Sequence, residues 1–221
     1  AKARREVLDV LDSHAGGPPP AAAPAALAAL AVAAAADARL CRDLVGLAGA
    51  EANARTYACA IGACKRGGGY AALGVELLAE AIRKGVANAV VHNEYIALHA
   101  RAGDWRGALD ALEDMFEAPH AAPTEVSLNA AIAACAAAGE VRAARRVHEV
   151  GFGRAGAEPT KVTFNSLLAA AHVAAKRRRK AGGGDDEGDR EETVAYVRET
   201  LQRMQLSLIH ISEPTRLRRI S

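Results

Sequence analysis

Aromatic residues are scarce in this chain: three Phe, four Tyr and one Trp make up 4% of its 221 residues. Hydrophobic residues reach 51%, but 55 residues are alanine, so only about a quarter of the chain is bulky and apolar. That supply can fill a thin layer between helices better than the deep core of a single globule or a sheet sandwich. Because alanine is the best helix former and a poor strand former, we do not expect a mostly β fold.

An excess of charge of one sign is also lacking. The 28 Lys and Arg residues against 26 Asp and Glu give a formal net charge of +2, so no global cationic field marks a nucleic-acid binder. The longest apolar run, residues 21–36, is nearly all alanine and is broken by Pro24. It is too short and too weakly hydrophobic to span a bilayer, so we expect a soluble chain with no membrane partner.

Metal-binding and catalytic motifs are lacking too. The sequence has no HExxH, no nucleophile elbow and no glycine-rich phosphate loop after a strand, and the glycines at 67–69 lie between two expected helices. The few cysteines lie far apart without a CxxC pair, which argues against a zinc site or disulfides and favours buried, reduced thiols; they are Cys41, Cys59, Cys64 and Cys135. We expect a non-enzymatic protein with no cofactor and no metal.

The two ends of the chain differ from its middle. Residues 1–24 are an N-terminal segment that ends in a Gly/Pro-rich linker, and residues 25–53 are expected to form an alanine-rich helical cap or a degenerate repeat. Residues 207–221 hold three Ile and no Ala, whereas the first 206 residues hold four Ile and all 55 Ala. We interpret 207–221 as a non-native tail and base no functional argument on it.

The main feature that the sequence does contain is an internal repeat. The string PTEVSLN ends at Asn129 and the similar string PTKVTFN ends at Asn165. Asn93 and Ala58 stand at the corresponding earlier positions, so the four anchors are separated by 35, 36 and 36 residues. Ten residues after the first three anchors comes a glycine, and the fourth unit has Ala175 there instead; the glycines are Gly68, Gly103 and Gly139.

Each unit is predicted to form two helices. The first starts after Thr56, Ser127 or Thr163, which suit an N-cap, and the second carries aliphatic residues at helical spacing, as in residues 105–115. Such short pairs cannot bury their apolar faces alone, but stacked neighbours can. We therefore predict an all-α fold, an α-solenoid of about four 35–36-residue helix-turn-helix repeats within 54–206. The expected units are 54–88, 89–124, 125–160 and 161–206, the last with a charged loop insert at 176–191.

The units resemble pentatricopeptide repeats, whose first helix reads roughly V-T-Y-N-x-L-I and whose second reads A-L-x-L-F-x-x-M. The matching strings are residues 55–61, 91–96, 126–132 and 162–168, and the tetratricopeptide pattern W-x₂-L-G-x₂-Y is absent. The resemblance implies sequence-selective binding of single-stranded RNA, one base per repeat. It also implies a role in organellar RNA processing, stability or translation, in a chloroplast or mitochondrion, although no targeting segment is visible.

The family's RNA-binding positions can be carried over residue by residue. By resemblance, the base-reading residues are Ala58, Asn93, Asn129 and Asn165; their partners at the ends of repeats are Asn88, Thr124 and Thr160; the residues that wedge between bases are Arg55, Val90, Val126 and Val162. Ala58 offers no side-chain hydrogen bond, and Thr replaces the family's usual Asp or Asn at two repeat ends. The resemblance therefore implies a weakly specified, pyrimidine-leaning footprint of three or four bases.

Simpler interpretations remain open at this point. The asparagines could have no role beyond satisfying backbone N–H groups at helix starts, and the valines could be ordinary packing residues. The basic run at 176–180 could contact phosphates, act as a nuclear-import-like patch or merely solvate a loop. The first helices with their lead-ins carry a net charge of +3, which favours RNA on their side, with Arg55, Lys65, Arg66, Arg101 and Lys161 against Glu94 and Glu125. The alternative function is a helical-repeat scaffold that binds another protein in its groove.

Overall fold

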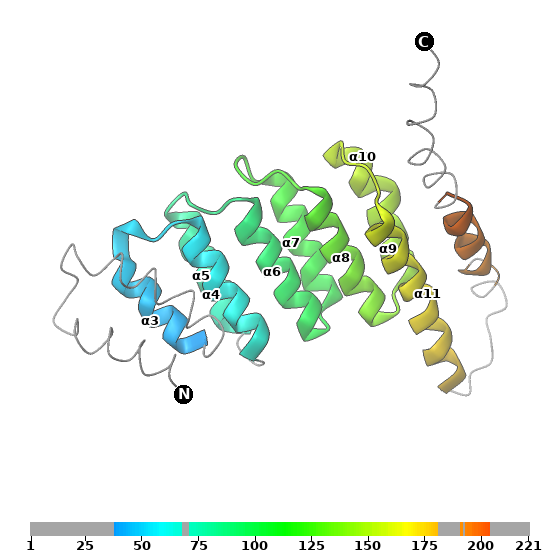
Figure 1. Cartoon of the computed structure of the whole chain (residues 1–221), viewed down its shortest axis with the longest axis horizontal. Coiled ribbons are helices and arrows are strands. Elements are labelled where there is room, and N and C mark those ends of the chain that lie inside the picture. Colours follow the sequence, from blue (N-terminus) through cyan, green and yellow to red (C-terminus); the bar gives the residue numbers. More distant parts are fainter. Residues whose placement is uncertain (1–37, 68–70, 181–190, 192, 204–221) are drawn as a thin grey trace, which may run out of the picture.

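The computed structural model describes residues 38–67, 71–180, 191 and 193–203, and every regular element in these ranges is a helix (Figure 1). The predicted all-α class is thus confirmed for this part of the chain. The expectations for residues 1–24, for the cap up to residue 37 and for the tail at 207–221 lie outside it. The elements are α3 (Ala38–Ala48), η1 (Gly49–Glu51), α4 (Ala54–Gly67), α5 (Ala71–Arg83), α6 (Ala89–Ala102), α7 (Trp105–Glu117), α8 (Glu125–Ala138), α9 (Val141–Arg146), the π-helical η2 (Val147–Gly151), α10 (Phe152–Ala155) and α11 (Lys161–Lys180).

The helices pack in two layers. The first helices of the predicted units, α4, α6, α8 and α11, pack each against the next and form what we call the first-helix layer (Figure 1). The second helices, namely α5, α7 and the segment α9–η2–α10, each pack on the first helix of their own unit. Within the described residues, successive second helices do not pack extensively on one another. Each second helix instead packs also on the first helix of the following unit.

Small and aliphatic side chains fill the space between the layers. Ile61, Ile96 and Ile132, each three residues after its anchor, are fully buried in the first-helix layer. Alanines such as Ala60 and Ala131 are buried beside them. Because a methyl side chain lets two helices approach closely, the alanine-rich composition suits this layer and requires few aromatic residues.

The first helices begin earlier than the sequence predicts. Ser127 and Thr163 do not cap α8 and α11 but stand at the third helical position, and their hydroxyl oxygens accept bonds from the backbone N–H groups of Thr124 and Thr160, both at 3.0 Å. Ser and Thr suit the N-cap position, and a polar residue three places later can equally bond back to the cap's N–H. The sequence alone therefore does not distinguish the two positions.

Glycine ends the first helices of the second and third units where predicted, and Gly68 of the first unit lies outside the described residues. Gly103 and Gly139 follow α6 and α8 with φ of 77° and 69°, a left-handed conformation that glycine adopts without steric cost. Ala175 stands at the corresponding point of α11, and the helix continues through Lys180 because alanine favours the right-handed helix. The predicted loop over 176–191 is therefore wrong for residues 176–180, and 181–190 lie outside the described residues. Residues 193–203 are helical, as predicted for the second helix of that unit.

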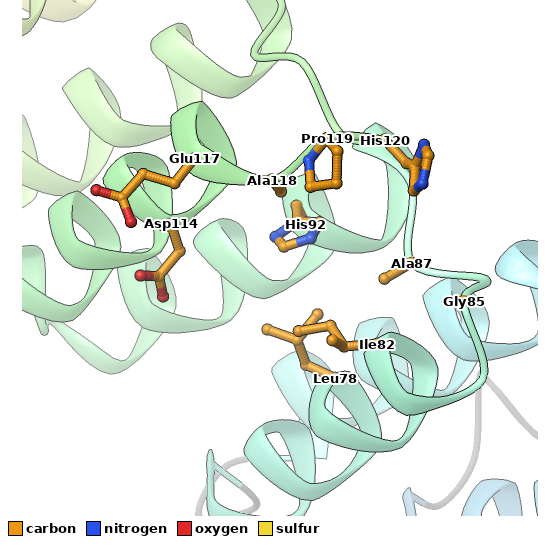
Figure 2. A pocket seen from close by; sticks show the side chains of 10 residues that line it. All are labelled: Leu78, Ile82, Gly85, Ala87, His92, Asp114, Glu117, Ala118, Pro119 and His120. Atoms are coloured by element: carbon orange, nitrogen blue, oxygen red, sulfur yellow. The ribbon is translucent and has the colours of Figure 1, made fainter.

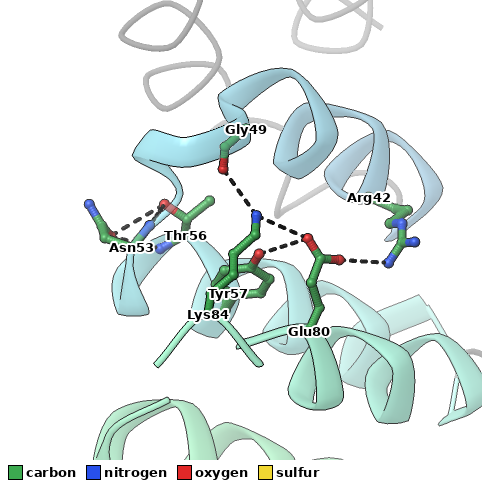
Figure 3. A network of polar contacts seen from close by, with 7 residues as sticks. All are labelled: Arg42, Gly49, Asn53, Thr56, Tyr57, Glu80 and Lys84. Atoms are coloured by element: carbon green, nitrogen blue, oxygen red, sulfur yellow. Dashed lines mark hydrogen bonds and ion pairs between the residues drawn. The ribbon is translucent and has the colours of Figure 1, made fainter. Parts of the chain in front are cut away.

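Helix α3 is joined to the first unit by a polar network (Figure 3). The carboxylate of Glu80 accepts hydrogen bonds from Tyr57 Oη at 2.8 Å and from Arg42 Nη1 at 3.3 Å, and lies 3.1 Å from Lys84 Nζ. Lys84 in turn donates to the carbonyl of Gly49 at 3.0 Å. Burial alone would raise the pKa of Glu80, but hydrogen bonds from Tyr57 and Lys84 outweigh it and lower the pKa. The network links α3, η1, α4 and α5 through one carboxylate.

We expect Glu80→Ala to lower the free energy of unfolding at pH 7 by about 1–2 kcal/mol, because it removes a carboxylate that accepts charged hydrogen bonds in a partly buried site. A carboxylate whose pKa is lowered by folding stabilises the protein above its unfolded pKa of about 4.3. The difference between wild type and variant should therefore shrink as the pH falls below that value. Urea unfolding at pH 7 and pH 4 measures it. Glu76→Ala, an exposed residue one turn earlier on α5, is the matched control, and an equal loss in both variants would contradict the prediction.

Candidate nucleic-acid interface

A row of exposed valines lies at the N-terminal ends of three first helices. Val90 on α6, Val126 on α8 and Val162 on α11 have exposed fractions of 55%, 62% and 58%. They are therefore not ordinary packing residues, which was the simpler interpretation of their pattern. Arg55, the corresponding residue of α4, is exposed as well. Because these helices pack side by side in one layer and each residue stands at the same point of its helix, the four side chains form a row across the first-helix layer.

The predicted base-reading residues follow the valines by three positions. Asn93 and Asn129 are partly exposed and Asn165 is exposed, whereas Ala58 is only 7% exposed and offers no polar group. Side chains three positions apart lie on the same face of a helix. Each asparagine therefore stands beside an exposed valine.

Hydroxyl groups of the following unit hold two of these asparagines. Ser127 Oγ donates to Asn93 Oδ1 at 2.6 Å, and Thr163 Oγ1 donates to Asn129 Oδ1 at 2.6 Å. Ser127 and Thr163 are fully buried, so each of these bonds forms in a site shielded from water. The amide oxygen of each asparagine is consequently engaged within the fold.

The orientation of the Asn129 amide has a second, independent determinant. Its Nδ2 donates to Glu125 Oε1 at 3.3 Å, and a carboxylate can only accept, so the amide nitrogen must face Glu125 and the oxygen must face Thr163. With one N–H bonded to Glu125, the amide still has its second N–H to donate to a ligand. Carbonyl oxygens, such as those of pyrimidine bases, are suitable acceptors for such donors.

The predicted repeat-end residues occur next to the asparagines with which they were paired. Thr124 Oγ1 lies 3.2 Å from Ser127 Oγ, which binds Asn93, and Thr160 Oγ1 lies 3.5 Å from Thr163 Oγ1. In the second and third units, the predicted base-reading asparagine and its repeat-end partner thus belong to one hydrogen-bonded group. In the first unit, Asn88 instead caps α6, where its Oδ1 accepts from Val90 N at 3.0 Å and from Val91 N at 3.3 Å.

Sequence reasoning missed the role of Ser127 and Thr163, although a signal was present. Asn93 and Asn129 are each followed 34 residues later by a hydroxyl residue, whereas Ala58 is followed after 33 residues by the apolar Val91. A polar anchor therefore pairs with a polar residue of the next unit, and an apolar anchor with an apolar one. Comparing consecutive units for such matched pairs would have identified the contact.

Cations on the first helices are only partly available to a ligand. Lys65 Nζ lies 2.8 Å from Glu94 Oε2 on the next helix, so part of the predicted positive charge is neutralised within the layer. Arg177, in the basic run at the end of α11, donates to the backbone carbonyls of Ala138 and Ala137. Besides Arg177, the exposed basic residues that stand on first helices are Arg55, Arg101, Lys161, Lys176, Arg179 and Lys180.

Thiol, metal and membrane chemistry find no support in the described part of the chain. Burial raises the pKa of Cys64 to about 11 and that of Cys135 to about 12, so both thiols stay protonated at neutral pH and are poor nucleophiles. Over residues 38–67, 71–180 and 193–203, no cluster of His, Cys, Asp and Glu is suited to a metal ion. No described helix combines the length and the apolar character that a bilayer span requires.

Comparison with known proteins adds no assignment. No protein-family model matches the chain, and no curated protein matches it. The candidate interface therefore rests on the repeat spacing, on the exposed valine row and on the hydrogen bonds that hold Asn93 and Asn129.

Proposed function

We propose that this protein binds single-stranded RNA along its first-helix layer, as an α-solenoid of about four pentatricopeptide-like units. The observation that carries the proposal is the row of valines at 90, 126 and 162, each more than half exposed at the same point of successive helices. Packing does not explain three exposed aliphatic side chains at a constant spacing. Their apolar surface suits contact with the faces of unstacked bases, which only a single strand presents.

The proposed mechanism assigns one base to each unit. The valines separate neighbouring bases, and the amide N–H groups of Asn93 and Asn129 donate to base carbonyl oxygens. Asn165 is exposed and has no such bond to a following unit among the described residues, and Ala58 supplies no donor. We therefore propose a footprint of three or four bases that is read mainly at the second and third units, with a preference for pyrimidines.

The family resemblance extends the proposal to the cellular role. It favours organellar RNA processing, stability or translation, in which a protein without catalysis protects or exposes a stretch of transcript. A short array with few exposed cations is expected to bind weakly. Exposed Arg55, Arg101, Lys161 and Lys176 are available for phosphate contacts.

Binding of the full chain to labelled RNA tests the proposal. Pyrimidine-rich and purine-rich single strands and a duplex of the same length should be compared across a salt series. We expect the affinity to be highest for the pyrimidine-rich strand, lower for the purine-rich strand and lowest for the duplex. The logarithm of the affinity should fall by about 0.7 per phosphate contact for each unit of log salt concentration. Equal affinity for single strand and duplex would show that binding is only nonspecific and electrostatic, which would contradict the proposal. Absence of binding at low salt would reject the RNA function and favour the scaffold alternative.

A further inference from the structure

A cavity lies on the second-helix side of the protein, between the first and second units (Figure 2). Its volume is about 400 Å³, within the range of sites that accept small ligands. Leu78 and Ile82 of α5 form one wall, and the carboxylates of Asp114 and Glu117 on α7 stand at its other side. The cavity is thus apolar within and acidic at its rim.

A buried histidine lines this cavity and carries an unsatisfied polar atom. His92 is only 3% exposed, and its Nδ1 has no hydrogen-bond partner. Figure 2 shows its ring in the gap between the helix that carries Leu78 and the segment that carries Pro119. Burial lowers the pKa of His92, partly opposed by Asp114, so the ring is neutral at pH 7 and can present one nitrogen as an acceptor. A buried polar atom without a partner is costly, which indicates that the cavity suits a ligand with hydrogen-bond donors.

The next junction between units shows which group closes such a gap. There Arg154, on α10, reaches across to α7, and its Nη1 lies 2.9 Å from both carboxylate oxygens of Glu113. Its guanidinium carbon also lies 4.0 Å from the centre of the Phe116 ring. One arginine side chain therefore bridges the second helices of the second and third units by an ion pair and a cation–π contact.

The first junction lacks this bridge. Counting back 36 residues from Arg154 gives Ala118, whose methyl group cannot span the gap, and counting back 35 from Glu113 gives Leu78. Both residues line the cavity. The space that an arginine closes at one junction is thus open at the other, with acidic side chains and an acceptor nitrogen around it.

We propose that this cavity binds the guanidinium group of an arginine side chain carried by a partner polypeptide. The planar group has five N–H donors for His92 and the carboxylate of Asp114, and its aliphatic stem would lie along Leu78 and Ile82. An ammonium group is a compact, strongly hydrated charge and matches an apolar cavity less well. The apolar wall and the carboxylates of the site stand on the second helices α5 and α7, whereas the valine row stands on first helices.

The test uses the RNA-free full chain and two blocked pentapeptides, one with a central arginine and one with a central lysine between alanines. We expect the arginine peptide to bind saturably, to shift the NMR signals of the His92 ring, and to bind at least about threefold more tightly than the lysine peptide. Asp114→Asn should weaken binding about fivefold, whereas Asp110→Asn on the same helix should leave it unchanged. Ala118→Arg should fill the cavity from within and abolish binding.

Several results would overturn the proposal. They are the absence of a saturable shift at His92, equal affinity for the arginine and lysine peptides, and unchanged binding by Ala118→Arg. Blocked arginine amide alone is the remaining comparison: a peptide that binds no more tightly than this single residue would reject a polypeptide as the occupant. None of these outcomes depends on RNA binding, so the two functions are tested separately.

Discussion

Replacing Asn93, Asn129 and Asn165 together by alanine is expected to lower the affinity of the full chain for its preferred single-stranded RNA by about a hundredfold. The estimate assigns about 1 kcal/mol to each lost hydrogen bond between an amide and a base. Affinity for a nonpreferred sequence should fall much less, because valine and phosphate contacts remain. Fluorescence anisotropy with two RNA sequences of equal length measures both effects.

The fold must be intact for that result to count. Circular dichroism should show unchanged helicity, since the three asparagines lie at or near the protein surface. Gln202→Ala, an exposed amide on the last helical segment, serves as the matched control and should leave RNA affinity unchanged. If the triple variant kept the base preference of the wild type, the assignment of these asparagines as base-reading residues would be wrong, even if RNA binding itself persisted.

The second large effect concerns the bonds between units. Combining Ser127→Ala with Thr163→Ala should lower the free energy of unfolding by about 2–6 kcal/mol. Each substitution leaves buried polar groups without a hydrogen-bond partner, which costs about 1–3 kcal/mol per substitution. Both hydroxyls are buried. Each hydroxyl accepts a hydrogen bond from the N–H of the residue that caps its helix and donates one to an asparagine of the preceding unit. Urea unfolding measures the loss.

A double-mutant cycle separates the contribution of the contact between units. Asn93→Ala combined with Ser127→Ala should be less destabilising than the sum of the single variants, with a coupling of about 0.5–1.5 kcal/mol. Ser166→Ala, which removes a half-buried hydroxyl from α11, is the control and should cost little. Strict additivity for Asn93 and Ser127 would show that the 2.6 Å contact contributes nothing to stability.

Ser127→Ala and Thr163→Ala should also reduce base preference if RNA binds as proposed. Without a donor facing its amide oxygen, Asn93 can turn over and present oxygen or nitrogen to a base, whereas the Asn129 amide loses one of the two contacts that orient it and keeps the contact with Glu125. The preference for pyrimidines should then fall more than the total affinity. This makes Ser127 and Thr163 positioning residues in the proposed function, since they act through Asn93 and Asn129 and not through direct contact with RNA.

Errors at the sequence level arose where one residue type suits two local structures. Ser127 and Thr163 match an N-cap and also the third position that bonds back to the cap, so the helix starts were misplaced. Ala175 replaces the glycine of the other units, and the helix continues through Lys180 where the sequence predicts a loop. By contrast, Gly103 and Gly139 were correctly placed because a left-handed residue after a helix strongly favours glycine.

By itself, the sequence determined the helical class of the described residues, the recurrence of units every 35 or 36 residues, and the residue type at each repeated position. Helix propensity, periodicity and glycine stops are local properties, so they can be read along the chain. Only the tertiary structure decided which polar atoms remain available. The bonds that engage Asn93 and Asn129 join residues 34 positions apart, and the cavity at His92 is assembled from separate helices and the segments that join them. Such contacts depend on how units pack, because a side chain's partner is set by the neighbouring helix and not by its own.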